Sequence, residues 1–164
     1  MKDRLARMHQ AAKDRLHDAD ILGASLDTRS DLQSFLRVLA FEVLLKAALL
    51  SSCGTIARSH RYRDLWAQLP TEARDKIMVI AAERSPGHAD LSNVENLLGW
   101  YEYVFERARY PYEIYEGYTP QEVRALGEYW EEIGAPSEEA VVQYHPEELH
   151  CLTEGLLAYV EAAL

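Results

Sequence analysis

The sequence predicts an all-α protein, a compact helical bundle of four or five main helices with shorter helices at its periphery. Apolar residues recur at helical spacing in several long segments, and prolines and glycines separate these segments. One short run, residues 140–144, has β-like composition, but it is too isolated to make a sheet. A chain of 164 residues is a suitable length for a single domain, 1–164, with one core.

The first two predicted helices cover residues 2–22 and 31–52. Gly23 is expected to interrupt the first, Ser30–Asp31 to cap the second, and Gly54 to stop it. The second helix is apolar on nearly every side. We therefore expect it to lie in the middle of the bundle and to be the most buried helix.

The later helices are bounded mainly by prolines. A proline is well placed at the first position of a helix, and it disfavours helix in the residue before it. For the second reason, Pro111 is expected to end a helix. The predicted segments are 60–69, 71–84, 91–110, 119–133 and a last helix that begins at Pro146.

The net charge of −10 is unevenly distributed along the chain. Residues 1–112 hold 16 basic and 15 acidic residues, whereas residues 113–164 hold one basic residue, Arg124, and 12 acidic ones. Binding to nucleic acid depends mainly on neutralising phosphates. A long DNA duplex is therefore not an expected partner, whereas the balanced charge of residues 1–112 allows a modest basic patch outside the acidic segment.

Cysteine content and hydropathy indicate the compartment. Cys53 and Cys151 are too few for a disulfide framework and are expected to be reduced thiols. No secretory leader opens the sequence. The longest apolar run, 38–50, contains Glu42 and Lys46 and is too short to span a bilayer. We expect a cytoplasmic protein with no membrane contact.

The central helix and its neighbours carry a recognisable pattern. Glu42 and Lys46 form a Glu-x-x-x-Lys motif, and a loop then leads to His60, which precedes a short helix. A further segment, 109–113, reads Arg-Tyr-Pro-Tyr-Glu. Over about residues 5–113, the chain resembles HEPN domains, which are helical modules associated with nucleotides and RNA in prokaryotes.

The resemblance implies two kinds of function. Many HEPN proteins are metal-independent ribonucleases of toxin–antitoxin and phage-defence systems, and they act as dimers that bring together two Arg-x4–6-His motifs. In that motif the histidine moves protons and the arginine stabilises charge at the scissile phosphate. Others lack the motif and serve as binding or assembly modules, often beside a nucleotidyltransferase. The resemblance thus implies a homodimer, with RNA, a nucleotide or a protein partner such as a nucleotidyltransferase, and no cofactor.

This sequence departs from the ribonuclease pattern, because no histidine follows Arg107 or Arg109 at the required distance. We therefore expect a non-catalytic module that binds nucleotide or RNA, or docks a partner, in a defence or toxin–antitoxin system. Two alternatives stay open. One is a divergent metal-independent ribonuclease that uses His60 with Arg107 or Arg109. The other is a purely structural interaction protein whose acidic C-terminal third is the partner surface.

Glu42 and Lys46 have two interpretations. They can form an intrahelical ion pair worth about 0.3–0.5 kcal/mol. Alternatively, Glu42 faces inward toward a basic group, with Arg109 the natural candidate, because an unpaired charge on a buried helix is costly.

Two clusters are candidates for binding. The first, within residues 58–63, is cationic and includes Tyr62. It suits phosphate contact with base stacking, or it is a solvated loop in which His60 caps the next helix. The second puts tyrosines beside Arg107, either as a nucleotide pocket or as a packing seam. The candidate binding residues are Arg58, His60, Arg61, Arg63, Arg109, Tyr112 and Glu113.

The segment around His145 and His150 contains metal-ligand residue types. The two histidines are five positions apart, so they do not share a helical face, and no established zinc motif supports them. No metal site is expected.

Overall fold

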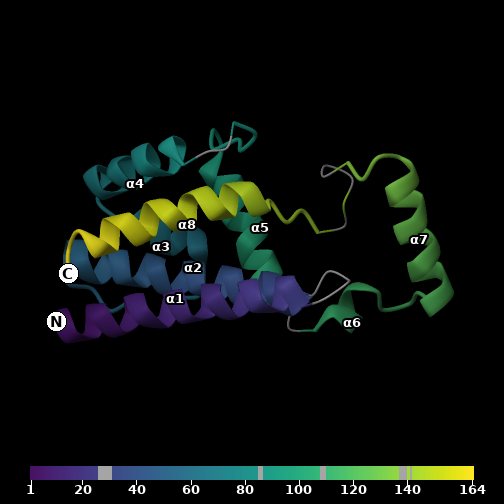
Figure 1. Cartoon of the computed structure of the whole chain (residues 1–164), viewed down its shortest axis with the longest axis horizontal. Coiled ribbons are helices and arrows are strands. Elements are labelled where there is room, and N and C mark those ends of the chain that lie inside the picture. The colour runs from purple at the N-terminus through teal and green to yellow at the C-terminus, as the bar shows by residue number, and fades with distance from the viewer. Residues whose placement is uncertain (26–30, 85–86, 108–109, 137–139, 141) are drawn as a thin grey trace.

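The computed structural model describes residues 1–164 except 26–30, 85–86, 108–109, 137–139 and 141. The described residues form helices and connecting segments without a strand, so the predicted all-α bundle is confirmed (Figure 1). The helices are α1 (Lys2–Ser25), α2 (Asp31–Cys53), α3 (Tyr62–Gln68), α4 (Thr71–Glu83), α5 (Val94–Arg107), α6 (Pro111–Ile114), α7 (Pro120–Glu132) and α8 (Pro146–Glu161).

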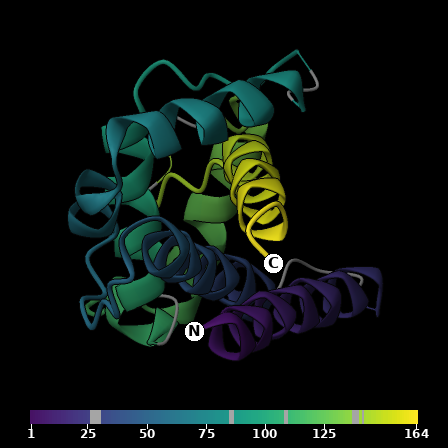
Figure 2. The same cartoon turned by 90° about the vertical axis from the view of Figure 1, so that its left-hand side faces the viewer.

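Helix α2 is the centre of the bundle. It packs along α1 and also contacts α8, α5 and α3, while α4 packs on α8 (Figures 1 and 2). Its second half is almost completely inaccessible: Phe41, Leu44, Leu45 and Leu49 are all fully buried. The expectation that this helix is the most buried is confirmed, and its cause is the apolar coverage on nearly every side.

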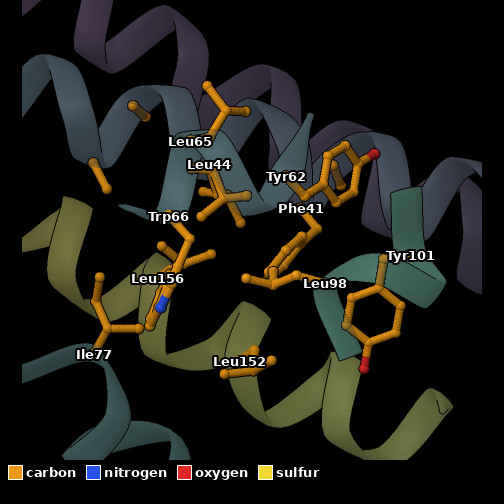
Figure 3. Packing of buried hydrophobic residues seen from close by; sticks show 14 of the residues in the cluster. Phe41, Leu44, Tyr62, Leu65, Trp66, Ile77, Leu98, Tyr101, Leu152 and Leu156 are labelled. Atoms are coloured by element: carbon orange, nitrogen blue, oxygen red, sulfur yellow. The ribbon is translucent and has the colours of Figure 1, made fainter. Parts of the chain in front are cut away.

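The core combines side chains from α2, α3, α4, α5 and α8, as Figure 3 shows. Helix α3 is short, yet it contributes Tyr62, Leu65 and Trp66, each buried. The Tyr62 hydroxyl donates a hydrogen bond of 2.9 Å to the Val38 carbonyl, which satisfies a buried polar group. The loop before α3 is thereby held against α2.

Several helix boundaries differ from those predicted, and α3, for example, begins at Tyr62 rather than at His60. Helix α1 continues through Gly23 to Ser25, and the missing Cβ of Gly23 leaves room for the Gln33 side chain of α2. Helix α5 begins at Val94 rather than at residue 91, since Asn93 caps it: the Asn93 side-chain oxygen accepts the Asn96 N–H at 3.1 Å. Ser30, proposed as part of a cap, lies outside the described residues.

The segment after α5 also differs from expectation. Pro111 was expected to end a helix that reaches residue 110, but α5 ends at Arg107 and Pro111 instead begins the one-turn helix α6. Residues 140 and 142–144 of the β-like run form no strand, and Val141 lies outside the described residues. Isolated β-type composition has no neighbouring strand to pair with here, so it forms a connecting segment.

Helix α7 projects from the bundle at the end opposite both chain termini (Figure 1). Thr119 and Glu122 form a capping box at its start, with the Thr119 N–H donating to the Glu122 carboxylate at 2.6 Å. These hydrogen bonds from Thr119 hold the pKa of Glu122 below its usual range. No residue of α7 is buried, so local capping rather than packing defines this helix.

No helix among the described residues has both the length and the apolar character needed to cross a membrane.

Candidate functional site

The candidate site is centred on Glu42, a charged residue in the buried face of α2. Only 5% of its side chain is exposed, and its Oε1 atom accepts a hydrogen bond from Lys46 Nζ at 2.8 Å. The intrahelical ion pair expected from the spacing is therefore present. The pair is mostly shielded from solvent, because the Lys46 side chain is 16% exposed.

His60 joins this pair from the loop between α2 and α3. Its Nδ1 atom lies 2.9 Å from the same Oε1 atom of Glu42. A carboxylate accepts hydrogen bonds only, so Nδ1 is the donor in this hydrogen bond and Nε2 stays free of it. The imidazole ring stacks on Phe105 of α5, with centroids 5.9 Å apart and planes 10° apart. With its side chain 65% exposed, His60 is both oriented and accessible.

The expectation that His60 caps the following helix is wrong. Arg61 is the N-cap residue of α3, and it makes no side-chain capping hydrogen bond. Glu102 of α5 serves that purpose instead, because its Oε2 atom accepts the Tyr62 N–H at 3.0 Å. The His60 imidazole is thus hydrogen-bonded to Glu42 and does not cap the helix.

Three arginines, Arg58, Arg61 and Arg63, lie within three positions of His60 in the sequence. Arg58 is exposed, and Arg61 and Arg63 approach Glu102 Oε1 at 3.9 Å each. Arg61 also lies 3.6 Å from Asp64. These separations are long for ion pairs and the arginine side chains are at least half exposed, so Glu102 restrains the guanidinium groups while leaving them open to solvent.

The second candidate cluster lies at the end of α5. Arg107 sits over the Tyr103 ring, 5.8 Å from its centroid, and pairs with Glu113 at 3.4 Å. Tyr110 and Tyr112 pack edge to face with centroids 6.1 Å apart, and both rings are exposed. The described residues of this cluster form a surface seam between α5 and α6.

Arg109, the predicted partner of Glu42 and a candidate binding residue, lies outside the described residues. The second oxygen of Glu42, Oε2, is buried and has no hydrogen-bond partner among the described residues. The pairing of Glu42 with Arg109 therefore remains a prediction.

Other reactive groups in the described chain do not converge on this site. No group of three or more histidine, cysteine or acidic side chains in that part could hold a metal ion. Burial raises the pKa of the Tyr101 hydroxyl, which donates to the His145 carbonyl at 3.0 Å and ties α5 to the start of α8. Burial also raises the pKa of the Cys151 thiol, which makes it a poor nucleophile.

Sequence reasoning missed Glu102 and Phe105 as parts of the site. Phe105 is a buried residue of the core, and its stacking on His60 joins the core to the surface. Glu102 had one available signal: it is a charged residue between the apolar positions of an amphipathic helix. Its contact with α3, however, spans 40 residues of sequence, and no local pattern indicates that.

No family model, curated protein or solved structure matches this chain.

Proposed function

We propose that this chain is a HEPN-like helical module that binds single-stranded RNA or a nucleotide through the surface formed by Arg58, His60, Arg61 and Arg63, without cleaving it. One observation supports the proposal above the others. An oriented imidazole stacked on Phe105 lies in the same short segment as three solvent-accessible arginines. Guanidinium groups neutralise phosphates, and exposed planar groups suit base stacking.

The charge of the protein limits the length of the RNA that it is expected to bind. Glu102 and Asp64 offset part of the arginine charge, and the rest of the protein brings the total to −10. Long-range repulsion therefore opposes an extended polyanion, while a short strand contacts only the local patch. We expect weak binding that decreases steeply as salt is raised.

Fluorescence anisotropy tests the proposal with a labelled, mixed-sequence RNA oligonucleotide. A length of about 12 nucleotides is within the site sizes known for single-strand binders. We expect Arg58→Gln and Arg63→Gln each to weaken binding several-fold and to reduce the salt dependence. Arg84→Gln is the matched control, because Arg84 is an exposed arginine at the end of α4, outside the patch. Absence of binding at low salt, or equal losses in all three variants, contradicts the proposal.

A second function, metal-independent RNA cleavage, is supported by the bond between His60 and Glu42. A buried carboxylate that orients an imidazole through Nδ1 leaves Nε2 placed to exchange a proton with a substrate. In this case Glu42 is a positioning residue, and Arg107 or Arg109 supplies the charge at the phosphate.

Cleavage of the same oligonucleotide by wild type, His60→Ala, Arg107→Ala and Arg109→Ala separates the two functions. A proton-transfer role for His60 is expected to make the alanine variant slower by about 10²–10⁴-fold. Under the non-cleaving proposal, wild type has no histidine-dependent cleavage of RNA. None of the substitutions therefore changes the cleavage rate. If Arg109→Ala only destabilises the protein, Arg109 is the structural partner of Glu42.

A further inference from the structure

The proposed function makes no use of the exposed apolar face of α7. The helix is amphipathic: Val123, Leu126, Trp130 and Ile133 follow one another at helical spacing, and Tyr129 adjoins them. Leu126 is 45% exposed and Tyr129 60% exposed. A sustained apolar stripe on a helix without buried residues marks a surface for another molecule.

The charges that flank this stripe limit what can cover it. Helix α7 carries four glutamates against one arginine, Arg124. Acidic flanks are repelled by nucleic acid and by anionic membrane surfaces. Two α7 helices packed on each other would also place glutamates beside glutamates, which is unfavourable. The complementary surface is therefore apolar with a basic rim.

A surface of that kind exists at the opposite end of the same chain. A cavity of about 220 Å³ is lined by Met8, Leu50 and Ile56, and also by the cationic residues Arg4 and Lys46. Ile56 is 54% exposed at the cavity. Residues 2–15 of α1, which include the lining residues Arg4 and Met8, hold five basic residues and two acidic ones, and Glu161 of α8 pairs with one of the basic residues, Lys13.

The size and position of the cavity indicate its occupant. Small-molecule sites usually measure about 300–1,000 Å³, so this cavity suits the apolar side chains of a docked helix better than a free ligand. It is lined from the first turns of α1, beside the N-terminus, whereas α7 projects from the other end of the bundle (Figure 1). Within one molecule, α7 and the cavity therefore lie at opposite ends of the bundle.

We propose that α7 docks into this cavity on a second copy of the chain, with Leu126 and Trp130 as the apolar anchors and the exposed Arg4 facing the α7 glutamates. Two molecules side by side in opposite directions make this contact twice, which closes the pair with two-fold symmetry. This interface differs from pairing through the long helices that the family resemblance implies.

Sedimentation of the full chain at tens of micromolar tests the proposal. We expect wild type to be a dimer. Leu126→Glu and Ile56→Glu each place a charge in the contact from opposite sides, and each is expected to weaken association by about tenfold or more. Both positions are exposed in the single chain, so the variants should keep the fold, which circular dichroism checks.

Matched controls add the same charge elsewhere. Gln121→Glu lies on the polar side of α7 and Val79→Glu on the exposed face of α4, and both are expected to leave the dimer intact. Mixing the Leu126→Glu and Ile56→Glu proteins should restore association in part, because each supplies the surface that the other lacks.

Three results overturn the proposal. One is a monomeric wild type at these concentrations. Another is an association that Leu126→Glu abolishes and Ile56→Glu does not, which means that α7 pairs with another surface. The third is an association sensitive only to Tyr103→Glu on α5, which means that the long helices form the interface instead.

Discussion

At the scale of single residues, a carboxylate in the core of an α-helical bundle is the unusual feature. Glu42 lies on a part of α2 where the other side chains are mostly apolar. Its Oε1 atom pairs with both Lys46 and His60. Buried charges are costly unless they are paired, so each member of this group depends on the others. The same dependence fixes the orientation of His60.

Replacing Glu42 should reveal that dependence. Glu42→Gln keeps the shape but leaves the mostly buried Lys46 ammonium without a carboxylate, and we expect the free energy of unfolding to decrease by about 3 kcal/mol. Asp20→Asn removes a surface ion pair with Arg37 and should cost less than about 1 kcal/mol. Urea denaturation measures both, and equal losses would show that the Glu42 group is not a buried network.

The two cysteines should differ in reactivity. Cys53 is exposed, whereas burial raises the pKa of the Cys151 thiol, so Cys151 forms less thiolate at any given pH. We expect iodoacetamide at pH 8 to modify Cys53 in the folded protein and Cys151 only after unfolding. Peptide mass spectrometry identifies the modified residue, and rapid labelling of Cys151 in the native protein would contradict its burial.

At the scale of helices, sequence patterns predicted where a helix lies in the bundle better than which distant side chains contact each other. The apolar coverage of α2 predicted its central place, because a helix with no polar face has to be surrounded. The spacing of Glu42 and Lys46 likewise predicted their pair. The contact of His60 with Glu42 was not predictable, since it depends on how an irregular loop returns to α2. The amphipathic character of α7 was visible in the sequence, but whether the bundle covers that helix depends on tertiary structure.

The two glycines in α7 and α8 should respond in opposite ways to alanine. At Gly155 a Cβ atom would lie 2.5 Å from the Ile77 carbonyl oxygen, so α4 and α8 approach closely there. We expect Gly155→Ala to destabilise the protein although alanine is the better helix former. At Gly127 in α7 a Cβ atom meets nothing within 4 Å, and Gly127→Ala should favour the helix by about 0.5–1 kcal/mol. Thermal denaturation and helical ellipticity measure the two effects, and a neutral Gly155→Ala would show that the α4–α8 contact adjusts easily.

At the scale of the whole molecule, stability is unevenly distributed. The bundle has one continuous core, whereas α7 is held by its caps and its own hydrogen bonds. The capping box of Thr119 and Glu122 lies at the start of α7, and Gly134 and Ala135 follow its far end with positive φ, of 90° and 51°. A helix of 13 residues without packing is marginal in water.

Hydrogen exchange should show this difference directly. In dilute protein, we expect the amides of α7 to exchange far faster than those of residues 44–50 in α2, which open only with global unfolding. At concentrations where the proposed dimer forms, α7 should become protected, and Ile56→Glu should abolish that gain. Slow exchange of α7 at every dilution would indicate that the bundle itself stabilises the helix.

The placement of α7 also gives the molecule an electric dipole along its long axis. Residues 110–136 contain six glutamates and one arginine, while residues 2–15, near the other end, have an excess of three positive charges. A field or a charged surface therefore orients the protein before any contact forms. On a positively charged support, α7 attaches first and the bundle end with the N-terminus of α1 faces the solvent.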